Sequence, residues 1–305
     1  MKLFQIIISL FFLLNACGAN QNQKVDKEGF SEHEPTGFQS IDGPDTNVIY
    51  QQKDSIILEN ILEELAALKD SPTPALLKKA GEFFRETPYV AHTLEADREQ
   101  LIINLRELDC TTYAENCLAL ANTVKNDNPS LEKFANELQR VRYRNGQLNG
   151  YPSRLHYFSD WISENEKKGL VKDVSKEIAN TPYPKTVNFM STHPESYKQL
   201  KNSSELVKKI AEKENEISAR EMYYIPESRI GEVDHLLEEG DIAGVTTGIE
   251  GLDISHVVIL IRKNGKIHPM HASTAAGKVV VDKATLEEYL LKSKSATGVM
   301  VARPI

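Results

Sequence analysis

The sequence predicts an α+β protein, in which helices occupy most of the chain before about residue 240 and an antiparallel β-sheet follows. Two observations predict this class. Apolar residues recur at steps of three and four through much of 53–222, which is typical of helices that bury one face. After Gly240, short β-branched segments alternate with Gly, Asn and Ser, which is the pattern of neighbouring strands. The 305 residues, 40% of them hydrophobic, are enough to form a sizeable core.

The expected elements follow in order along the chain. Helices are predicted at about 53–70, 74–87, 109–125, 131–145, 153–168 and 203–222, the first two ending before a proline. Strands are predicted at 241–247, 254–263, 266–273, 278–282 and 299–303. Between the second and third strands, Asn264-Gly265 is the strongest short signal for a hairpin and predicts a two-residue type I′ turn. Strands joined in this way pair antiparallel.

The first residues have the character of an export signal. Lys2 precedes an almost unbroken apolar run over 3–14, which is too short to cross a bilayer comfortably. Residues 1–17 end in Cys17 and resemble the signal peptide and lipobox of bacterial lipoproteins. This resemblance implies acylation of Cys17 and a membrane-anchored protein of the cell envelope, on the periplasmic or outer-membrane face. An ordinary cleaved signal with an incidental cysteine is the alternative. Polar residues over 18–50 predict a flexible tether.

Charge and cysteine content exclude two classes of protein. Lys and Arg number 36 against 44 Asp and Glu, a formal charge of −8, and no long basic run is present. Binding to nucleic acid is therefore not expected, because phosphate contacts need clustered Lys and Arg. The three cysteines are too few for a disulfide scaffold.

One cysteine lies where a helix is predicted to begin. Asp109 is a good N-cap, which places Cys110 in the first turn of the helix at 109–125. There the free N–H groups and the helix dipole favour a thiolate, the reactive form of cysteine. Cys117 lies about 10 Å further along the axis, so the two cannot form a disulfide within one helix. Cys110 is therefore predicted to be a free thiol and a candidate nucleophile, and Cys117 a core residue.

The predicted hairpin brings two histidines together. With the turn at 264–265, the register makes His256 and His271 diagonal neighbours on one face of the sheet, whereas His268 faces the other way. A bulge at Pro269, which lacks an N–H, would shift this register. Two histidines that merely stack or face solvent are the alternative.

These three residues supply the parts of a cysteine hydrolase site, namely a thiol nucleophile, a histidine base and a polar group that orients the base. Cys110 would be the nucleophile and His256 the base, and His271 would fix the tautomer of His256. A metal site made of the same residues is disfavoured, because the sequence shows no close-spaced further ligands such as CxxC or HExxH. No metal and no cofactor is predicted.

At this point the sequence resembles the NlpC-type papain-like cell-wall hydrolases, whose motifs occur here in the family's order. They are Thr87-Pro88-Tyr89-Val90, Leu108-Asp109-Cys110-Thr111, Glu239-Gly240-Asp241-Ile242, Ser255-His256-Val257 and His271-Ala272-Ser273. More narrowly, 104–116, 151–161 and 251–256 look characteristic of the N-acetylmuramoyl-L-alanine amidase-like branch, and the likeness extends over most of 53–305. Val258 and Ala91-His92 depart from the usual pattern of the family, which puts details of the substrate pocket in doubt.

The resemblance implies a papain-like cysteine hydrolase fold, with a helical N-terminal part packed on a C-terminal antiparallel sheet. The domain would occupy 51–305, with a helical insertion at about 126–235. The implied reaction is cleavage of the amide between N-acetylmuramic acid and L-alanine in peptidoglycan or muropeptides.

The resemblance also suggests which residues contact the substrate. The backbone N–H of Cys110, helped by the Tyr89 hydroxyl, would stabilise the oxyanion. Arg154 would clamp a substrate carboxylate. The full set of predicted substrate-side residues is Tyr89, Asp109, Tyr151, Ser153, Arg154, Tyr157 and Ser255. For 153–161 the alternative is a helix start capped by Ser153 and followed by an aromatic core stripe.

Two other functions stay open at this stage. One is a peptidoglycan endopeptidase that uses the same three residues but cuts between residues of the stem peptide. The other is a cell-wall-binding lipoprotein whose site is inactive.

Overall fold

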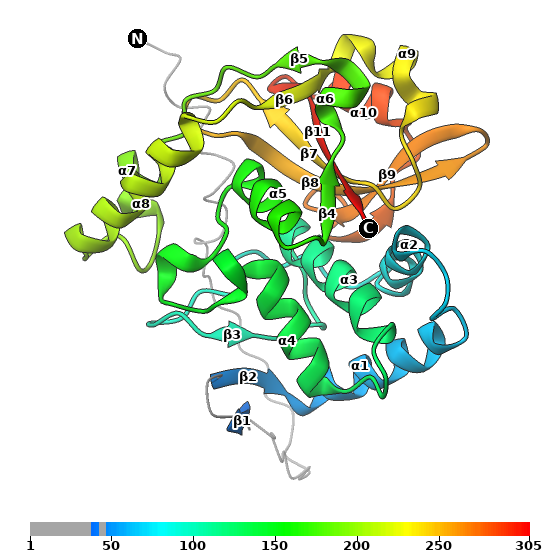
Figure 1. The fold of residues 1–305 in the computed structure, drawn as a ribbon, viewed down its shortest axis with the longest axis vertical. Coiled ribbons are helices and arrows are strands. Elements are labelled where there is room, and N and C mark those ends of the chain that lie inside the picture. Colours follow the sequence, from blue (N-terminus) through cyan, green and yellow to red (C-terminus); the bar gives the residue numbers. More distant parts are fainter. Residues whose placement is uncertain (1–37, 43–46) are drawn as a thin grey trace, which may run out of the picture. The chain divides into compact units, whose positions relative to one another are not determined.

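The computed structural model describes residues 38–42 and 47–305, and they form the predicted α+β fold of helices and a mainly antiparallel sheet (Figure 1). The helices are α1 (Gln52–Ala66), α2 (Thr73–Phe83), α3 (Cys110–Val124), α4 (Leu131–Arg142), α5 (Phe158–Lys167), α6 (Ser175–Ala179), α7 (Phe189–Thr192), α8 (Ser204–Ser218), α9 (Ile230–Val233) and α10 (Leu286–Lys292). None of the helices in this part of the chain is long and apolar enough to cross a membrane.

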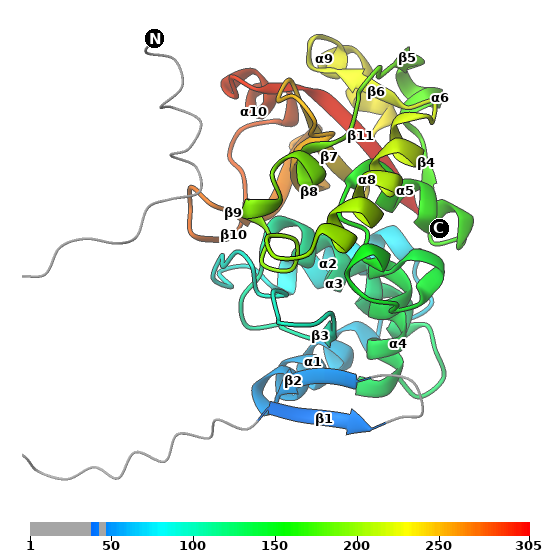
Figure 2. The ribbon, with the colours of Figure 1, turned by 90° about the vertical axis from the view of Figure 1, so that its left-hand side faces the viewer.

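The strands form two sheets. The smaller sheet contains β1 (Phe38–Asp42), β2 (Asn47–Gln51) and β3 (Leu101–Ile102). The larger contains β4 (Val171–Asp173), β5 (Thr181–Pro182), β6 (Tyr223–Pro226), β7 (Ile242–Thr247), β8 (Ile254–Lys263), β9 (Lys266–Ser273), β10 (Lys278–Val281) and β11 (Ala296–Pro304). Its strand order is β10-β9-β8-β7-β11-β6-β5, with β4 paired to β11. In Figure 2, α2 and α3 lie between the two sheets.

The hairpin of β8 and β9 has the predicted register. Lys263 pairs with Lys266 and Ile261 with His268, and no shift occurs at Pro269. Asn264 and Gly265 both have positive φ, 52° and 78°, as a type I′ turn requires. The prediction of this hairpin is confirmed.

The larger sheet is buried on both faces. Along β8, Val257 and Ile259 belong to the apolar core that α1 to α5 also line. Val258 and Leu260 alternate with them and pack in a second core with α9 and α10. His256 shares the face of Val258, so the histidine pair lies on the α10 side of the sheet.

Three sequence predictions need correction. The predicted tether at 18–50 must end before residue 50. Both β1 and most of β2 fall within this range, and Val48 is buried. The short apolar run 48–50 becomes a strand by pairing with β1 on one side and with β3, fifty residues away, on the other. The insertion at 126–235 is not wholly helical, since β4, β5 and β6 join the larger sheet. The helix α10 was not predicted. The signal peptide, Cys17 and residues 18–37 lie outside the described residues.

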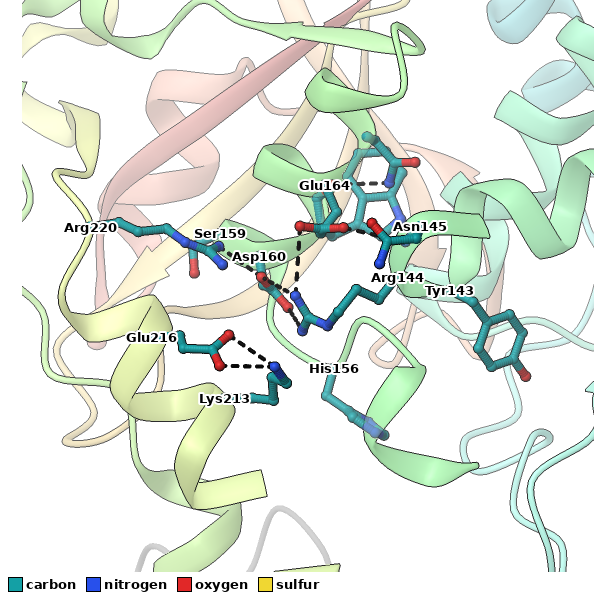
Figure 3. Close-up of polar contacts among 12 residues, drawn as sticks. Tyr143, Arg144, Asn145, His156, Ser159, Asp160, Glu164, Lys213, Glu216 and Arg220 are labelled. Carbon is teal, nitrogen blue, oxygen red and sulfur yellow. Dashed lines mark hydrogen bonds and ion pairs between the residues drawn. The ribbon is translucent and has the colours of Figure 1, made fainter. Parts of the chain in front are cut away.

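Ion pairs hold the inserted helices together (Figure 3). Asp160 on α5 is almost fully buried and binds Arg144 from the turn after α4. It also accepts a hydrogen bond from Arg220, just beyond α8, at 2.7 Å. One carboxylate therefore joins α5, the turn after α4 and the segment after α8.

Candidate active site

The backbone around 86–90 places the start of α3 beside the edge of the sheet. The N–H of Tyr89 donates to Gly277, next to β10, at 2.9 Å. The N–H of Val90 donates to Leu108 at 3.1 Å, two residues before Cys110. This segment therefore pairs with the sheet edge on one side and with the approach to α3 on the other.

Cys110 is the first residue of α3, as the sequence predicts. The Asp109 carboxylate accepts a hydrogen bond from the Thr112 N–H at 2.7 Å, which is the expected N-cap. The thiol is half-buried and free, and Cys117 is buried in the core. The backbone N–H of Val257 donates toward the sulfur. The thiol therefore lies beside the peptide bond between His256 and Val257.

The histidine pair forms as predicted. His256 Nε2 lies 2.6 Å from His271 Nδ1, and the two rings are nearly perpendicular. His271 is almost fully buried, whereas His256 keeps partial exposure. Tyr289 on α10 packs edge-on against His271, with ring centroids 5.4 Å apart. The three rings hold the His256 imidazole in one orientation.

The protonation of the thiol differs from the sequence prediction. Burial raises the pKa of the Cys110 thiol to about 12, and the neighbouring Asp109 carboxylate raises it further. Hydrogen bonds from the Val257 N–H and from Thr111 act in the opposite direction. Desolvation and the Asp109 carboxylate therefore oppose the thiolate that the helix start was expected to favour, and they favour the neutral thiol.

The histidines are neutral as well. Burial lowers the pKa of His256 to about 3, with a further contribution from His271. Burial also lowers the pKa of His271, while the Asp282 carboxylate opposes this shift. A neutral imidazole beside a neutral thiol can act as a general base that takes the proton as the sulfur attacks.

Tyr89 is half-buried close to the nucleophile. Its pKa is raised, first by burial and then by Cys110 and Asp109. The hydroxyl therefore stays protonated and can donate a hydrogen bond, which an oxyanion helper needs.

A pocket of about 410 Å³ opens beside the start of α3. Its lining residues are His92, Leu94, Glu95, Asp109, Thr111, Thr112, Glu115, Tyr151, Arg154, Leu155, His156, Ser196, Tyr197 and Lys198. A smaller chamber of about 30 Å³ shares Thr111, Glu115 and His156 with it and reaches Val257 on β8. Both pockets therefore lie between the start of α3 and the insertion, and Cys110, His256 and His271 are next to them in the fold but do not line them.

Arg154 lines this pocket but is not a free cation. It is buried, and its guanidinium binds Glu95 at 2.8 Å and Glu99 at 3.4 Å. The same group lies over the Tyr151 ring. Two carboxylates already offset its charge, so the expectation of an open clamp for a substrate carboxylate is corrected: a ligand would have to displace Glu95.

The other predicted substrate-side residues do not all reach the pocket. Asp109 and Tyr151 line it. The Tyr157 hydroxyl is buried, donates to Glu214 at 2.7 Å and accepts from a backbone N–H. Ser153 closes a turn by donating to Gly150, and it is outside the pocket lining. Ser255 is exposed where β8 bulges against β7, away from the face of His256.

Three residues around the site were not identified from the sequence. They are Asp282 after β10, Tyr289 on α10 and His156, which lines both pockets. Burial and the Arg154 charge lower the pKa of His156 to about 3, and its Nε2 bonds the Tyr151 carbonyl at 2.9 Å. Asp282 is separated from His271 by a whole strand in sequence, so no local pattern points to it. Within 38–42 and 47–305, no group of three or more His, Cys, Asp or Glu could hold a metal ion.

The fold and the site together define an amidase-like α+β protein. Residues 79–299 match the AmiA-like family, described as N-acetylmuramoyl-L-alanine amidase-like, and the chain belongs to this family.

Solved structures that share this fold carry different descriptions. An N-acetylmuramoyl-L-alanine amidase from Bacteroides uniformis is 38% identical with a TM-score of 0.73, covering 76% of this chain and 99% of its own. A candidate xylanase from Bacteroides fragilis is 44% identical with a TM-score of 0.70, covering 73% and 98%. A protein from Legionella pneumophila, 23% identical with a TM-score of 0.63, covers 83% and 95% and shares the fold. A comparison with curated proteins gives no match.

Proposed function

We propose that this protein is a cysteine-dependent, metal-independent amidase of the papain-like NlpC type. Its substrate would be the amide between N-acetylmuramic acid and L-alanine in peptidoglycan or muropeptides. The observation that carries the proposal is the cluster formed by the start of α3 with β8 and β9: the Cys110 thiol lies beside the His256–Val257 peptide, and His256 is hydrogen-bonded to His271. The match to the amidase-like family supports the substrate class.

In this proposal each nitrogen of His256 has a part in the reaction. Because Nε2 is bound to His271, Nδ1 is the base that takes the thiol proton. The sulfur attacks the carbonyl carbon of the lactyl group, and the C–N bond then breaks as the imidazolium returns the proton to the leaving amine of L-alanine. Water, deprotonated by the same nitrogen, hydrolyses the thioester and regenerates the thiol.

The oxyanion of each tetrahedral intermediate needs donors that are already in place. The backbone N–H of Cys110 lies in the first turn of α3, where it has no helical partner. The Tyr89 hydroxyl, protonated and close to the sulfur, would be the second donor.

The N-terminal sequence supports a location for this activity. A signal peptide at 1–17, acylation of Cys17 and a tether would hold the domain at a membrane of the cell envelope. Mass spectrometry of the protein from its native membrane tests this, with a diacylglycerol adduct on Cys17 as the expected result and a fully soluble, unmodified Cys17→Ala variant as the control. A mature N-terminus beyond Cys17 would contradict it.

The central test is digestion of purified muropeptides, analysed by mass spectrometry. The wild-type protein should release intact stem peptide that begins with L-alanine, and Cys110→Ala should lower this release by at least about 10³-fold. Cys117→Ala is the matched control, since this buried cysteine lies in the same helix and its loss should leave the release within about twofold.

Three other outcomes of this digestion would each point to a different function or mechanism. Truncated stem peptides would indicate an endopeptidase. No cleavage by the wild-type protein, together with binding of muropeptides, would indicate an inactive binding protein. Full activity in Cys110→Ala would exclude the cysteine mechanism.

The xylanase description of one structural neighbour makes xylan a necessary negative control. A glycosidase needs two carboxyl groups that act on the glycosidic bond. In the pocket, Glu95 is ion-paired with Arg154 and Glu115 with Arg142. The site therefore favours amide cleavage, and release of reducing sugar from xylan would overturn this preference.

A further inference from the structure

A carboxylate lies at the far end of the histidine pair. Asp282 follows β10, and its backbone N–H donates to the Pro269 carbonyl at 2.8 Å. Its Oδ1 accepts a hydrogen bond from the Ala284 N–H at 2.8 Å, which fixes the side chain. Its Oδ2 is 3.8 Å from His271 Nε2. The side chain is about one-third exposed, so solvent reaches it from the outer side.

The tautomers of the two histidines require an acceptor at this position. If His256 Nδ1 is to accept the thiol proton, the proton of the neutral ring must be on Nε2. That N–H then donates to His271 Nδ1, at the observed 2.6 Å. His271 must in turn carry its own proton on Nε2. This nitrogen is buried and has no hydrogen-bond partner among the described residues, and an unpaired buried donor is costly.

We propose that Asp282 is a positioning residue that accepts the His271 Nε2 proton and so selects the tautomer in which His256 is a base. This rests on the proposed cysteine mechanism. The 3.8 Å separation is an ion-pair distance, and a small rotation of the carboxylate or one bridging water completes the hydrogen bond. The proposed chain of proton donors and acceptors then runs from Cys110 through His256 and His271 to Asp282.

The electrostatics of the site support this assignment. The groups that face His271 are His256 from β8, Tyr289 from α10 and Asp282 from the end of β10. Tyr289 is uncharged near neutral pH, since burial followed by the charges of Asp282 and Cys110 raises its pKa to about 12. Asp282 is therefore the anion that stabilises an imidazolium on this pair during turnover.

The test compares Asp282→Ala with Asp282→Asn. Alanine removes the acceptor, so kcat for muropeptide cleavage should fall about 10- to 100-fold, with KM changed less than about twofold. Asparagine keeps an oxygen acceptor without the charge and should recover part of this loss. The rate at which iodoacetamide alkylates Cys110 at pH 7 should be highest in the wild-type protein, lower in Asp282→Asn and lowest in Asp282→Ala. This measurement needs no substrate.

A substrate-free readout separates this proposal from the proposed function. If the wild-type protein cleaves no muropeptide but Asp282→Ala slows alkylation, the substrate assignment fails and the positioning role stands. Alkylation of Asp282→Ala at the wild-type rate would overturn the positioning role, whatever the substrate.

A second readout distinguishes positioning from loss of structure. Histidine nitrogen NMR should show both rings as Nε2–H tautomers in the wild-type protein, and a mixture of tautomers in Asp282→Ala. Thr285→Ala is the matched control, because Thr285 caps α10 in the same loop and its hydroxyl accepts from the Glu288 N–H rather than from a histidine. It should lower the melting temperature but leave the tautomers and kcat unchanged. Wild-type tautomers in Asp282→Ala would also overturn the proposal.

Discussion

Individual side chains in this protein derive their protonation state from burial more than from neighbouring charges. Cys110 lies at a helix start, yet its pKa is raised to about 12, and His156 and His256 have pKa values lowered to about 3. Desolvation is the largest cause in each case. Desolvation therefore favours the neutral forms of these three side chains.

Buried neutral histidines make stability depend on pH. Between about pH 3 and 6.5 the unfolded chain binds a proton on His156 that the folded chain does not, so acid favours unfolding. Each such histidine contributes a slope of up to about 1.4 kcal/mol per pH unit, with stability lost as the pH falls below 6.5.

His156→Gln should therefore reduce the loss of unfolding free energy between pH 6.5 and 5, measured by urea denaturation. The amide of glutamine can keep the donor to the Tyr151 carbonyl. His235→Gln, at an exposed histidine, is the control and should keep the wild-type slope. An unchanged slope in His156→Gln would contradict burial of the neutral ring.

At the scale of elements, Asp109 at the start of α3 affects both the stability of this helix and the reactivity of the Cys110 thiol. The Asp109 carboxylate caps the helix but also raises the pKa of the Cys110 thiol. Asp109→Asn keeps the capping oxygen and removes the charge, so alkylation of Cys110 at pH 8 should be faster than in the wild-type protein at nearly the same melting temperature. Asp109→Ala should also react faster and lose about 1 kcal/mol of stability. Slower alkylation in Asp109→Asn would contradict this electrostatic account.

Elements with a strong local signal were predicted well. The hairpin of β8 and β9 was found with its register because Asn264-Gly265 determines the turn, and the turn determines which residues pair. The strand β2 and the helix α10 were missed. Both are short, which leaves little periodicity to detect, and partners distant in sequence hold α10 and one side of β2.

At the scale of the whole molecule, a buried ion pair connects the helix that carries the nucleophile to the rest of the fold. Arg142 on α4 binds Glu115 on α3 at 2.7 Å, and both are almost fully buried. Arg142 also donates to the Ile102 carbonyl in β3 at 2.8 Å. A single guanidinium therefore joins α3, α4 and the smaller sheet.

Removing one partner of this pair should be costly. Arg142→Met would leave a buried carboxylate without its cation and should lower the free energy of unfolding by about 3–5 kcal/mol. Glu115→Leu combined with Arg142→Met should recover most of this loss, because no uncompensated charge remains. Urea denaturation followed by the fluorescence of Trp161, the one tryptophan of the chain, measures both. A double variant as unstable as the single one would show that the pair itself contributes the stability.

The sequence by itself determined the order of the long helices and of strands β7 to β11, the hairpin register, and the meeting of His256 with His271. It also placed Cys110 at a capped helix start. These follow from periodicity, turn chemistry and capping, which act over a few residues. Only the tertiary structure showed that Arg154 is ion-paired, that burial raises the pKa of the Cys110 thiol, and that Asp282 lies beside His271. Ion pairing and desolvation depend on which distant segments pack around a group, and no local pattern in the chain contains that information.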